Sequence, residues 1–293
     1  MGLDSNMTVK PAASRFFEQE SVNFLITNLI ARRLLTDFMG WFSKIEQPLV
    51  RDLSIGAWRL FAPVDLSDSA KQEFRSLHDC FVRELKDGAR PIDARPEILV
   101  SPCDAVVGAC GQIDGEEILQ IKGSPYALGE LLHDPDLVEA HRDGCYATLR
   151  LLSSMYHHFH APHDCCVDRV TYISGDVWNV NPPALRRVEK LFCKNERAVI
   201  QCALESSGKP ITLIPVAAVL VASMRFDFLD ATLNLRNAGG NAFPCSAKLK
   251  KGQKMGWFEH GSTIIVFAPK DVRLFEGIAV GSRIRVGEPL MRL

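Results

Sequence analysis

Short apolar runs follow one another along the chain from about Ile98, and each is broken by glycine, proline, aspartate or asparagine. Runs of this length, so often interrupted, are typical of antiparallel strands joined by tight turns. Only Tyr126–Leu132 and Pro183–Leu191 predict helices within this region. The sequence therefore predicts an α+β fold with a mainly antiparallel β core. The expected strands lie within residues 106–108, 118–121, 147–152, 199–204, 211–216, 251–258, 264–269 and 278–286.

The first 62 residues have a different pattern. After a lead-in that ends near residue 15, large apolar side chains recur at helical spacing up to Ile45, and Pro48 separates them from a second amphipathic helix. Such helices either pack on the protein core or lie in a membrane interface, and their periodicity alone favours packing. Basic residues are interleaved with the apolar ones, at Arg32, Arg33 and Lys44.

A third helix is expected from Leu66 to about Leu85, because apolar side chains recur on one side of this stretch and acidic residues lie near its start. These side chains are Phe74, Leu77, Phe81 and Leu85. The chain is thus divided into helices within residues 1–62 and a main domain over residues 63–293.

Composition excludes several classes of protein. With 293 residues, 47% of them hydrophobic, the chain can bury a full core. Its 34 Lys and Arg residues balance 35 Asp and Glu residues, so we expect no nucleic-acid partner. The nine cysteines are odd in number and show no Cys-x-x-Cys spacing, which favours a reducing compartment over a disulfide framework. Neither a secretory signal nor a run of 18 apolar residues is apparent.

A Gly261-Ser262-Thr263 corner lies between two of the expected strands, at residues 251–258 and 264–269. Glycine allows other groups to approach its carbonyl, and the serine beside it supplies a hydroxyl nucleophile. This pairing has the chemistry needed for an intramolecular attack on the peptide bond. The same tripeptide is also common in ordinary turns.

Two further clusters carry chemistry. Asp104 lies in a proline-bounded loop at the start of a strand, and His157, His158 and His160 follow Tyr156. On a strand, His158 and His160 would share one face while His157 points the other way. The histidines could hold a metal together with His163, Cys165 or Cys166. Alternatively, one imidazole, oriented by Asp104, could act as the base for Ser262.

The segments Ser101–Ala105, Tyr156–Pro162 and Gly261–Thr263, in this order and at this separation, resemble the signature of the phosphatidylserine decarboxylase proenzymes. Further phrases similar to the family extend the resemblance to about residues 20–293. They are residues 81–87, 90–93, 120–123, 126–128, 175–177, 191–197 and 251–256.

The resemblance implies a precursor that cleaves itself between Gly261 and Ser262. The products would be a large subunit of residues 1–261 and a small subunit of residues 262–293, with residue 262 converted to a pyruvoyl group. That covalent cofactor would serve as the electron sink of a carboxy-lyase that converts phosphatidylserine to phosphatidylethanolamine.

Site residues carry over from the family one by one. Ser262 matches the pyruvoyl precursor and Asp104 the orienting carboxylate. His157 matches the base and is also the candidate proton donor to the decarboxylated intermediate, while His160 matches the second histidine. His158 is assigned no catalytic role, and no metal is expected. The sequence departs from the family at His260, where leucine is common, at Ala105, where glycine is usual, and at the alanines within residues 216–223.

A lipid substrate changes the interpretation of the first helices, which we then expect on the anionic, cytoplasmic face of the cell membrane, as in a peripheral enzyme. Family precedent also suggests a homodimer. Two other hypotheses stay open at this point. One is a pyruvoyl-dependent decarboxylase of a free amino acid, and the other is a zinc-binding, non-enzymatic β protein.

Overall fold

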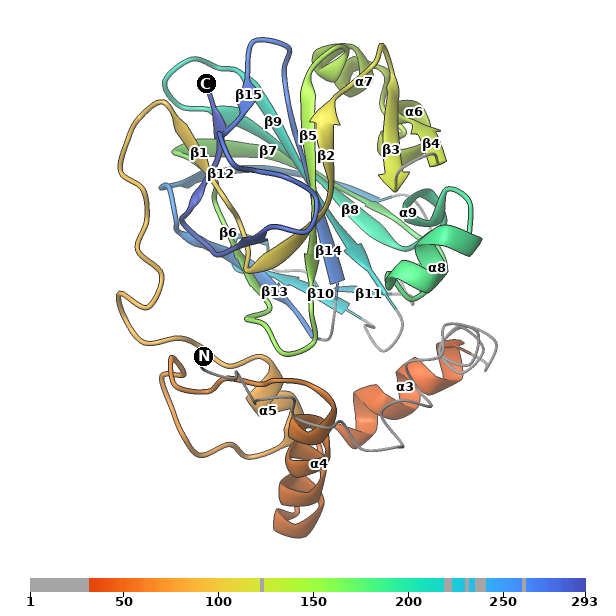
Figure 1. Cartoon of the computed structure of the whole chain (residues 1–293), viewed down its shortest axis with the longest axis vertical. Helices are drawn as coiled ribbons and strands as arrows, with labels where there is room; N and C mark the ends of the chain where they lie inside the picture. Colours follow the sequence, from red (N-terminus) through yellow and green to blue (C-terminus); the bar gives the residue numbers. More distant parts are fainter. Residues whose placement is uncertain (1–31, 122–123, 219–222, 230–231, 235–240, 260–261) are drawn as a thin grey trace, which may run out of the picture.

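The computed structural model describes residues 32–121, 124–218, 223–229, 232–234, 241–259 and 262–293 (Figure 1). Its centre is an eight-stranded antiparallel sheet in the order β12-β7-β8-β9-β14-β5-β2-β16, which confirms the expected α+β class. The strands of this sheet are β2 (Ala105–Gln112), β5 (Cys145–Leu151), β7 (Cys165–Ile173), β8 (Arg197–Leu204), β9 (Pro210–Ala217), β12 (Asn241–Leu249), β14 (Ser262–Ala268) and β16 (Arg283–Ile284).

Strand β14 lies in the middle of this sheet, paired with β9 on one side and β5 on the other. All seven of its residues are buried. Its sequence shows a continuous apolar run because both faces of the sheet are covered, which removes the alternation of a half-exposed strand. Ser262 is its first residue.

Two hydrophobic cores lie on opposite faces of the large sheet. One face packs against two small sheets, β11-β10-β13-β6 and β1-β17-β15. Short helices and the β3-β4 hairpin cover the other face. These covering elements are β1 (Ile98–Val100), β3 (Glu117–Ile121), β4 (Ser124–Ala127), β6 (His158–His160), β10 (Ser223–Phe226), β11 (Thr232–Asn234), β13 (Lys254–Phe258), β15 (Arg273–Leu274), β17 (Pro289–Arg292), α6 (Leu128–Leu132), α7 (Pro135–His141), α8 (Pro182–Arg187) and α9 (Leu191–Lys194).

The helices α3 (Arg32–Phe42), α4 (Pro48–Phe61) and α5 (Leu77–Phe81) lie together below one end of the sheets (Figure 1). Pro48 occupies the first turn of α4, and the side chain of Gln47 caps this helix by accepting a bond from the amide of Val50. The two amphipathic helices expected near the N-terminus are thus confirmed within the described part of the chain. Residues 16–31, which the same expectation included, lie outside the described residues.

The prediction of a helix from Leu66 to Leu85 is wrong, because only α5 is helical there. Residues 65–76 form turns in which polar side chains bond to nearby backbone groups. Asp65 accepts from the amide of Ser67, and Ser69 donates to the carbonyl of Lys71. Such local bonds offer the backbone an alternative to helix, so the apolar spacing alone overestimated it.

Other helix boundaries also differ from expectation. The helix expected at residues 126–132 begins only at Leu128, since Tyr126 belongs to β4. The helix expected at residues 183–191 is two short helices, α8 and α9, separated near Lys190, whose φ of 53° is left-handed. Helix α7 was not expected, although Asp134 caps it and Pro135 begins it. The strand expected at residues 278–286 is mostly turn and retains only the two residues of β16.

Candidate active site

Ser262 is held by strands on both sides, opposite Leu151 of β5 and Ala217 of β9. Its side chain is buried, with 1% of the residue exposed, and its Oγ has no hydrogen-bond partner among the residues that the structure describes. Gly261 and His260, the residues before it, lie outside the described residues. The structure therefore places a buried serine hydroxyl, without a bond that the fold depends on, at the start of a rigid strand.

A cavity of about 470 Å³ opens beside Ser262. It lies between the first helices and one end of the large sheet, and most of its walls are apolar. Its polar lining residues include Arg150, Ser153 and two asparagines of the segment that leads into α8. The full lining consists of Met39, Trp58, Leu77, Phe81, Arg150, Leu151, Leu152, Ser153, Asn179, Val180, Asn181, Ala218 and Ser262.

His157 is fixed behind the wall of this cavity. Its Nε2 lies 3.1 Å from the carbonyl oxygen of Leu152, and its ring stacks on Phe81 with 4.0 Å between the ring centroids. Both Leu152 and Phe81 line the cavity. Because Leu151 pairs with Ser262 in the sheet, the structure brings His157 and Ser262 to the same short segment.

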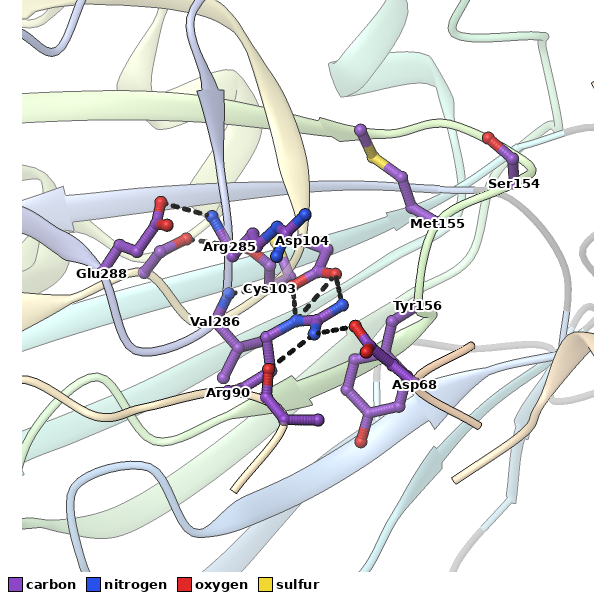
Figure 2. Close-up of polar contacts among 12 residues, drawn as sticks. Asp68, Arg90, Cys103, Asp104, Ser154, Met155, Tyr156, Arg285, Val286 and Glu288 are labelled. Atoms are coloured by element: carbon purple, nitrogen blue, oxygen red, sulfur yellow. Dashed lines mark hydrogen bonds and ion pairs between the residues drawn. The ribbon is translucent and has the colours of Figure 1, made fainter. Parts of the chain in front are cut away.

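Asp104 is held by a different group of residues, shown in Figure 2. Arg90 donates to both of its carboxylate oxygens, from Nε at 2.9 Å and from Nη2 at 2.6 Å, and the amide of Val286 donates to Oδ1 at 2.9 Å. Arg90 also donates to Asp68 at 2.9 Å. Burial lowers the pKa of Arg90, but its bonds to Asp104 and Asp68 outweigh burial and raise that pKa overall. Asp104 is therefore a paired carboxylate, held on both oxygens by Arg90.

His160 lies on the Asp104 side of the site. Its Nδ1 is 2.9 Å from the carbonyl oxygen of Gly252, and its Nε2 is 3.2 Å from the hydroxyl of Tyr156. Tyr156, Asp104 and Arg90 line a second cavity of about 320 Å³. Burial lowers the pKa of His160, whereas the charge of Asp104 acts in the opposite direction.

His158 is bonded to structural groups. Its Nε2 lies 3.0 Å from the carbonyl oxygen of Val82, and its ring stacks on those of Tyr156 and Trp257. Burial lowers its pKa to about 4, so the ring is neutral near pH 7. Tyr156 contacts both His158 and His160, while His157 stacks elsewhere, which confirms the expected division of the histidines between two faces.

The predicted triad thus falls into two neighbouring groups. Ser262 lines the first cavity, and His157 lies behind its wall, bonded to Leu152. Asp104 and Tyr156 line the second cavity, and Tyr156 bonds to His160. Leu152 lines both cavities and connects them. Within the described ranges, Asp104 bonds to Arg90 and Val286 and to neither histidine.

The histidine rings are bonded to separate acceptors rather than directed at one point, and no group of three metal-ligating side chains occurs among the residues with described placement.

Sequence reasoning missed the pairing of Arg90 with Asp104. A buried aspartate requires a cation, but nothing in the sequence indicates which one. It also missed Arg150, which lines the Ser262 cavity.

A buried serine hydroxyl, a fixed imidazole and a paired carboxylate around two cavities are the features of an enzyme rather than of a binding or structural module. The family model described as phosphatidylserine decarboxylase matches residues 77–292. The chain belongs to the phosphatidylserine decarboxylase family, as its sequence signature indicated, and is a carboxy-lyase.

Curated relatives support this assignment over most of the chain, and each is named phosphatidylserine decarboxylase proenzyme. The protein of Haemophilus influenzae strain Rd is 34% identical over 265 residues, which cover 87% of this chain and 91% of the relative. That of Pasteurella multocida is 32% identical over 294 residues, or 97% and 98% of the two chains. That of Vibrio cholerae O395 is 36% identical over 227 residues, or 74% and 78%.

Proposed function

We propose that this chain decarboxylates phosphatidylserine to phosphatidylethanolamine with a pyruvoyl group formed from Ser262. The observation that carries the proposal is the buried hydroxyl of Ser262, which begins the central strand and opens on a largely apolar cavity. Family membership supplies the reaction, and the word proenzyme in the relatives' names denotes a precursor that must be processed.

The residues present fit a pyruvoyl group at position 262. Within the described chain, the Oγ of Ser262 makes no hydrogen bond, so its departure as part of the new carboxylate of Gly261 breaks no side-chain bond of the fold there. Strand β14 is paired with β9 along one edge and with β5 along the other, and both pairings include residue 262. The pyruvoyl ketone supplies an electron sink for the pair of electrons left when carbon dioxide departs.

Self-cleavage uses the chain's own atoms. The Oγ of Ser262 loses its proton to a base and bonds to the carbonyl carbon of Gly261, and the bond from this carbon to the nitrogen of residue 262 breaks to give an ester and an amine. Removal of the α-proton of residue 262 then expels the ester oxygen, leaving a carboxylate on Gly261 and dehydroalanine at 262. Addition of water releases ammonia and leaves the ketone.

His157 is the base that the geometry supports best. A carbonyl only accepts, so the Nε2 of His157 carries the proton that it donates to Leu152, and Nδ1 is the basic nitrogen. The stacked ring of Phe81 fixes the orientation of the imidazole. His160 instead uses both nitrogens, donating from Nδ1 to Gly252 and accepting from Tyr156 at Nε2. We assign His157 as base and proton donor, with Asp104 and His160 as supporting groups.

The intact mass of the purified protein tests this proposal. The wild type is expected as two fragments, residues 1–261 and 262–293, with the smaller one blocked at its N-terminus and lighter than a free serine start requires. Ser262→Ala should stay whole, whereas the control Ser207→Ala, in the exposed turn after β8, should cleave normally. A wild-type chain that remains uncut would refute self-processing.

Apolar side chains on α4 support a membrane surface as the place of reaction. The helix has no buried residue, and Leu49, Leu53 and Leu60 are 69%, 73% and 81% exposed. Their spacing puts them on one stripe of the helix. Trp58 faces the other way, contacts Phe81 in a tilted ring pair and lines the Ser262 cavity. We assign the stripe to the headgroup region of the membrane, which brings the lipid beside the cavity.

None of the described helices has both the length and the apolar content needed to span a membrane. An interfacial site on the cytoplasmic face, inferred from the lipid substrate and the apolar stripe of α4, stays our proposal for the location. The division between residues 1–62 and 63–293 and the homodimer also stay predictions.

Vesicle flotation without detergent separates a lipid substrate from a free amino acid. The wild type should float with vesicles that contain phosphatidylserine, and the variant Leu53→Ser with Leu60→Ser should float much less. The control Leu119→Ser removes a leucine that is also exposed, at 42%, but lies on β3. Wild-type protein that stays in the aqueous fraction would favour the free amino acid.

A further inference from the structure

Arg150, the next-to-last residue of β5, lines the cavity of Ser262. Within the part of the chain that the structure describes, its guanidinium makes no hydrogen bond or ion pair, and its Nε is fully buried. Three arginines with little exposure in the described chain are bonded: Arg83 to two carbonyls, Arg90 to Asp104, and Arg197 to the carbonyls of residues 130, 131, 193 and 195. Arg150 is the exception that needs a physical reason.

The fold makes room for this side chain. Gly108 of β2 lies against it, and a Cβ on that glycine would be 2.7 Å from the Cδ of Arg150. Burial lowers the pKa of Arg150, yet a guanidinium remains charged at any physiological pH. Arg150 is half-buried, and holding its charge partly out of water without a counter-ion among the described residues is costly. The cost is compensated when an anion from outside the chain enters the cavity.

The cavity favours an anion attached to an apolar body. Its described lining contains no carboxylate, its walls are mostly apolar, and Asn179 and Asn181 add neutral amides. A phosphatidylserine headgroup carries two anions, a carboxylate and a phosphodiester. A guanidinium bound to the carboxylate would stabilise the group that must leave as neutral carbon dioxide, and such ground-state binding slows decarboxylation. The phosphodiester keeps its charge throughout, so binding it costs nothing in rate.

We propose that Arg150 binds the phosphodiester of the lipid headgroup and so positions the serine moiety at residue 262. This inference rests on the proposed function, because it assumes that the lipid enters this cavity. The planar guanidinium matches the geometry of phosphate oxygens and can bind two of them at once. Free inorganic phosphate shares this chemistry, so the experiment must distinguish the two.

Calorimetric titration of short-chain lipids tests the proposal without any turnover. Dihexanoyl phosphatidylserine and dihexanoyl phosphatidylethanolamine, both below their critical micelle concentrations, are titrated into Ser262→Ala and into the same chain with Arg150→Met. Methionine keeps an unbranched stem over Gly108. We expect Arg150→Met to weaken the binding of both lipids by a similar factor, on the order of 10- to 100-fold, as for the loss of charge-assisted hydrogen bonds. The affinity of Arg150→Lys should fall between those of the arginine and methionine proteins.

The lipid pair identifies the bound group, since phosphatidylethanolamine has the phosphodiester but not the carboxylate. Weaker binding of phosphatidylserine alone would assign Arg150 to the carboxylate and overturn the proposal. Equal lipid affinities of Ser262→Ala with and without Arg150→Met would also overturn it, as would no binding of either lipid to Ser262→Ala. So would binding of inorganic phosphate alone. The control Arg142→Met removes an exposed arginine just before the other end of β5 and should change neither affinity.

Kinetics separate this inference from the proposed function. Arg150→Met should still cleave itself, as judged by intact mass, and should raise KM for phosphatidylserine far more than it lowers kcat. A cleaved wild type with no decarboxylase activity would contradict the proposed function alone. An active wild type with an unchanged KM in Arg150→Met would contradict the role of Arg150 alone.

Discussion

Replacing Arg90 with methionine removes the cation that holds Asp104 in place. The two side chains are 13% and 8% exposed, and Arg90 binds both carboxylate oxygens. After the change, Asp104 keeps only the amide of Val286. Breaking a buried pair from one side costs about 3–5 kcal/mol, because the remaining charge stays out of water. This is about two to nearly four decades in the unfolding equilibrium constant.

The assay is urea denaturation in the Ser262→Ala background, so that every variant is the same uncleaved chain. Arg95→Met is the matched control, because Arg95 binds Asp93 in the same forked geometry but at the surface, with 47% of its side chain exposed. It should leave the denaturation midpoint nearly unchanged. Adding Asp104→Leu to Arg90→Met removes the orphaned charge and should restore much of the lost stability.

Two outcomes would refute this reasoning. One is a loss in Arg90→Met no larger than that in Arg95→Met. The other is a double variant at least as unstable as Arg90→Met alone. Either would mean that the contact between Arg90 and Asp104 does not hold the loop at the start of β2.

Further predictions concern glycines and protonation. Gly256→Ala should destabilise the fold by at least about 1–3 kcal/mol, since its Cβ would lie 2.0 Å from the carbonyl oxygen of Arg225. Gly56→Ala should stabilise the fold by about 0.5–1 kcal/mol, because this glycine lies on the exposed side of α4 and its Cβ would have nothing within 4 Å. Thermal or urea unfolding of both variants checks these two values. Burial lowers the pKa of His141 from 6.5 to about 4, so the unfolded chain binds a proton below pH 6.5 and the folded chain does not until about pH 4. Stability should therefore be full above pH 6.5 and fall by roughly 3 kcal/mol on acidification to pH 4, and His141→Gln should show a flatter pH dependence in urea titrations. An unchanged slope in that variant would contradict the assignment.

Local patterns predicted the elements whose apolar residues are continuous or recur at a regular spacing. The apolar run at residues 264–269 predicted β14, and the spacing around Pro48 predicted the helix that begins there. The same reasoning failed at residues 66–76, where the apolar spacing was helical but Asp65 and Ser69 bond locally to the backbone. Periodicity reports which side of a segment is apolar and does not report such competing bonds.

The sequence by itself determined the family, because a family signature depends on residue types at fixed positions along the chain. It also predicted the order of the proposed site segments and singled out Ser262. Only the tertiary structure decided that Asp104 pairs with Arg90 and that His157 rather than His160 lies beside the strand segment opposite Ser262. It alone also decided that Arg150 lines the cavity with no partner among the described residues. The physical reason is that strand partners and register place residues side by side that are far apart in the chain. Side-chain spacing fixes the face on which a residue lies but leaves open what it meets there.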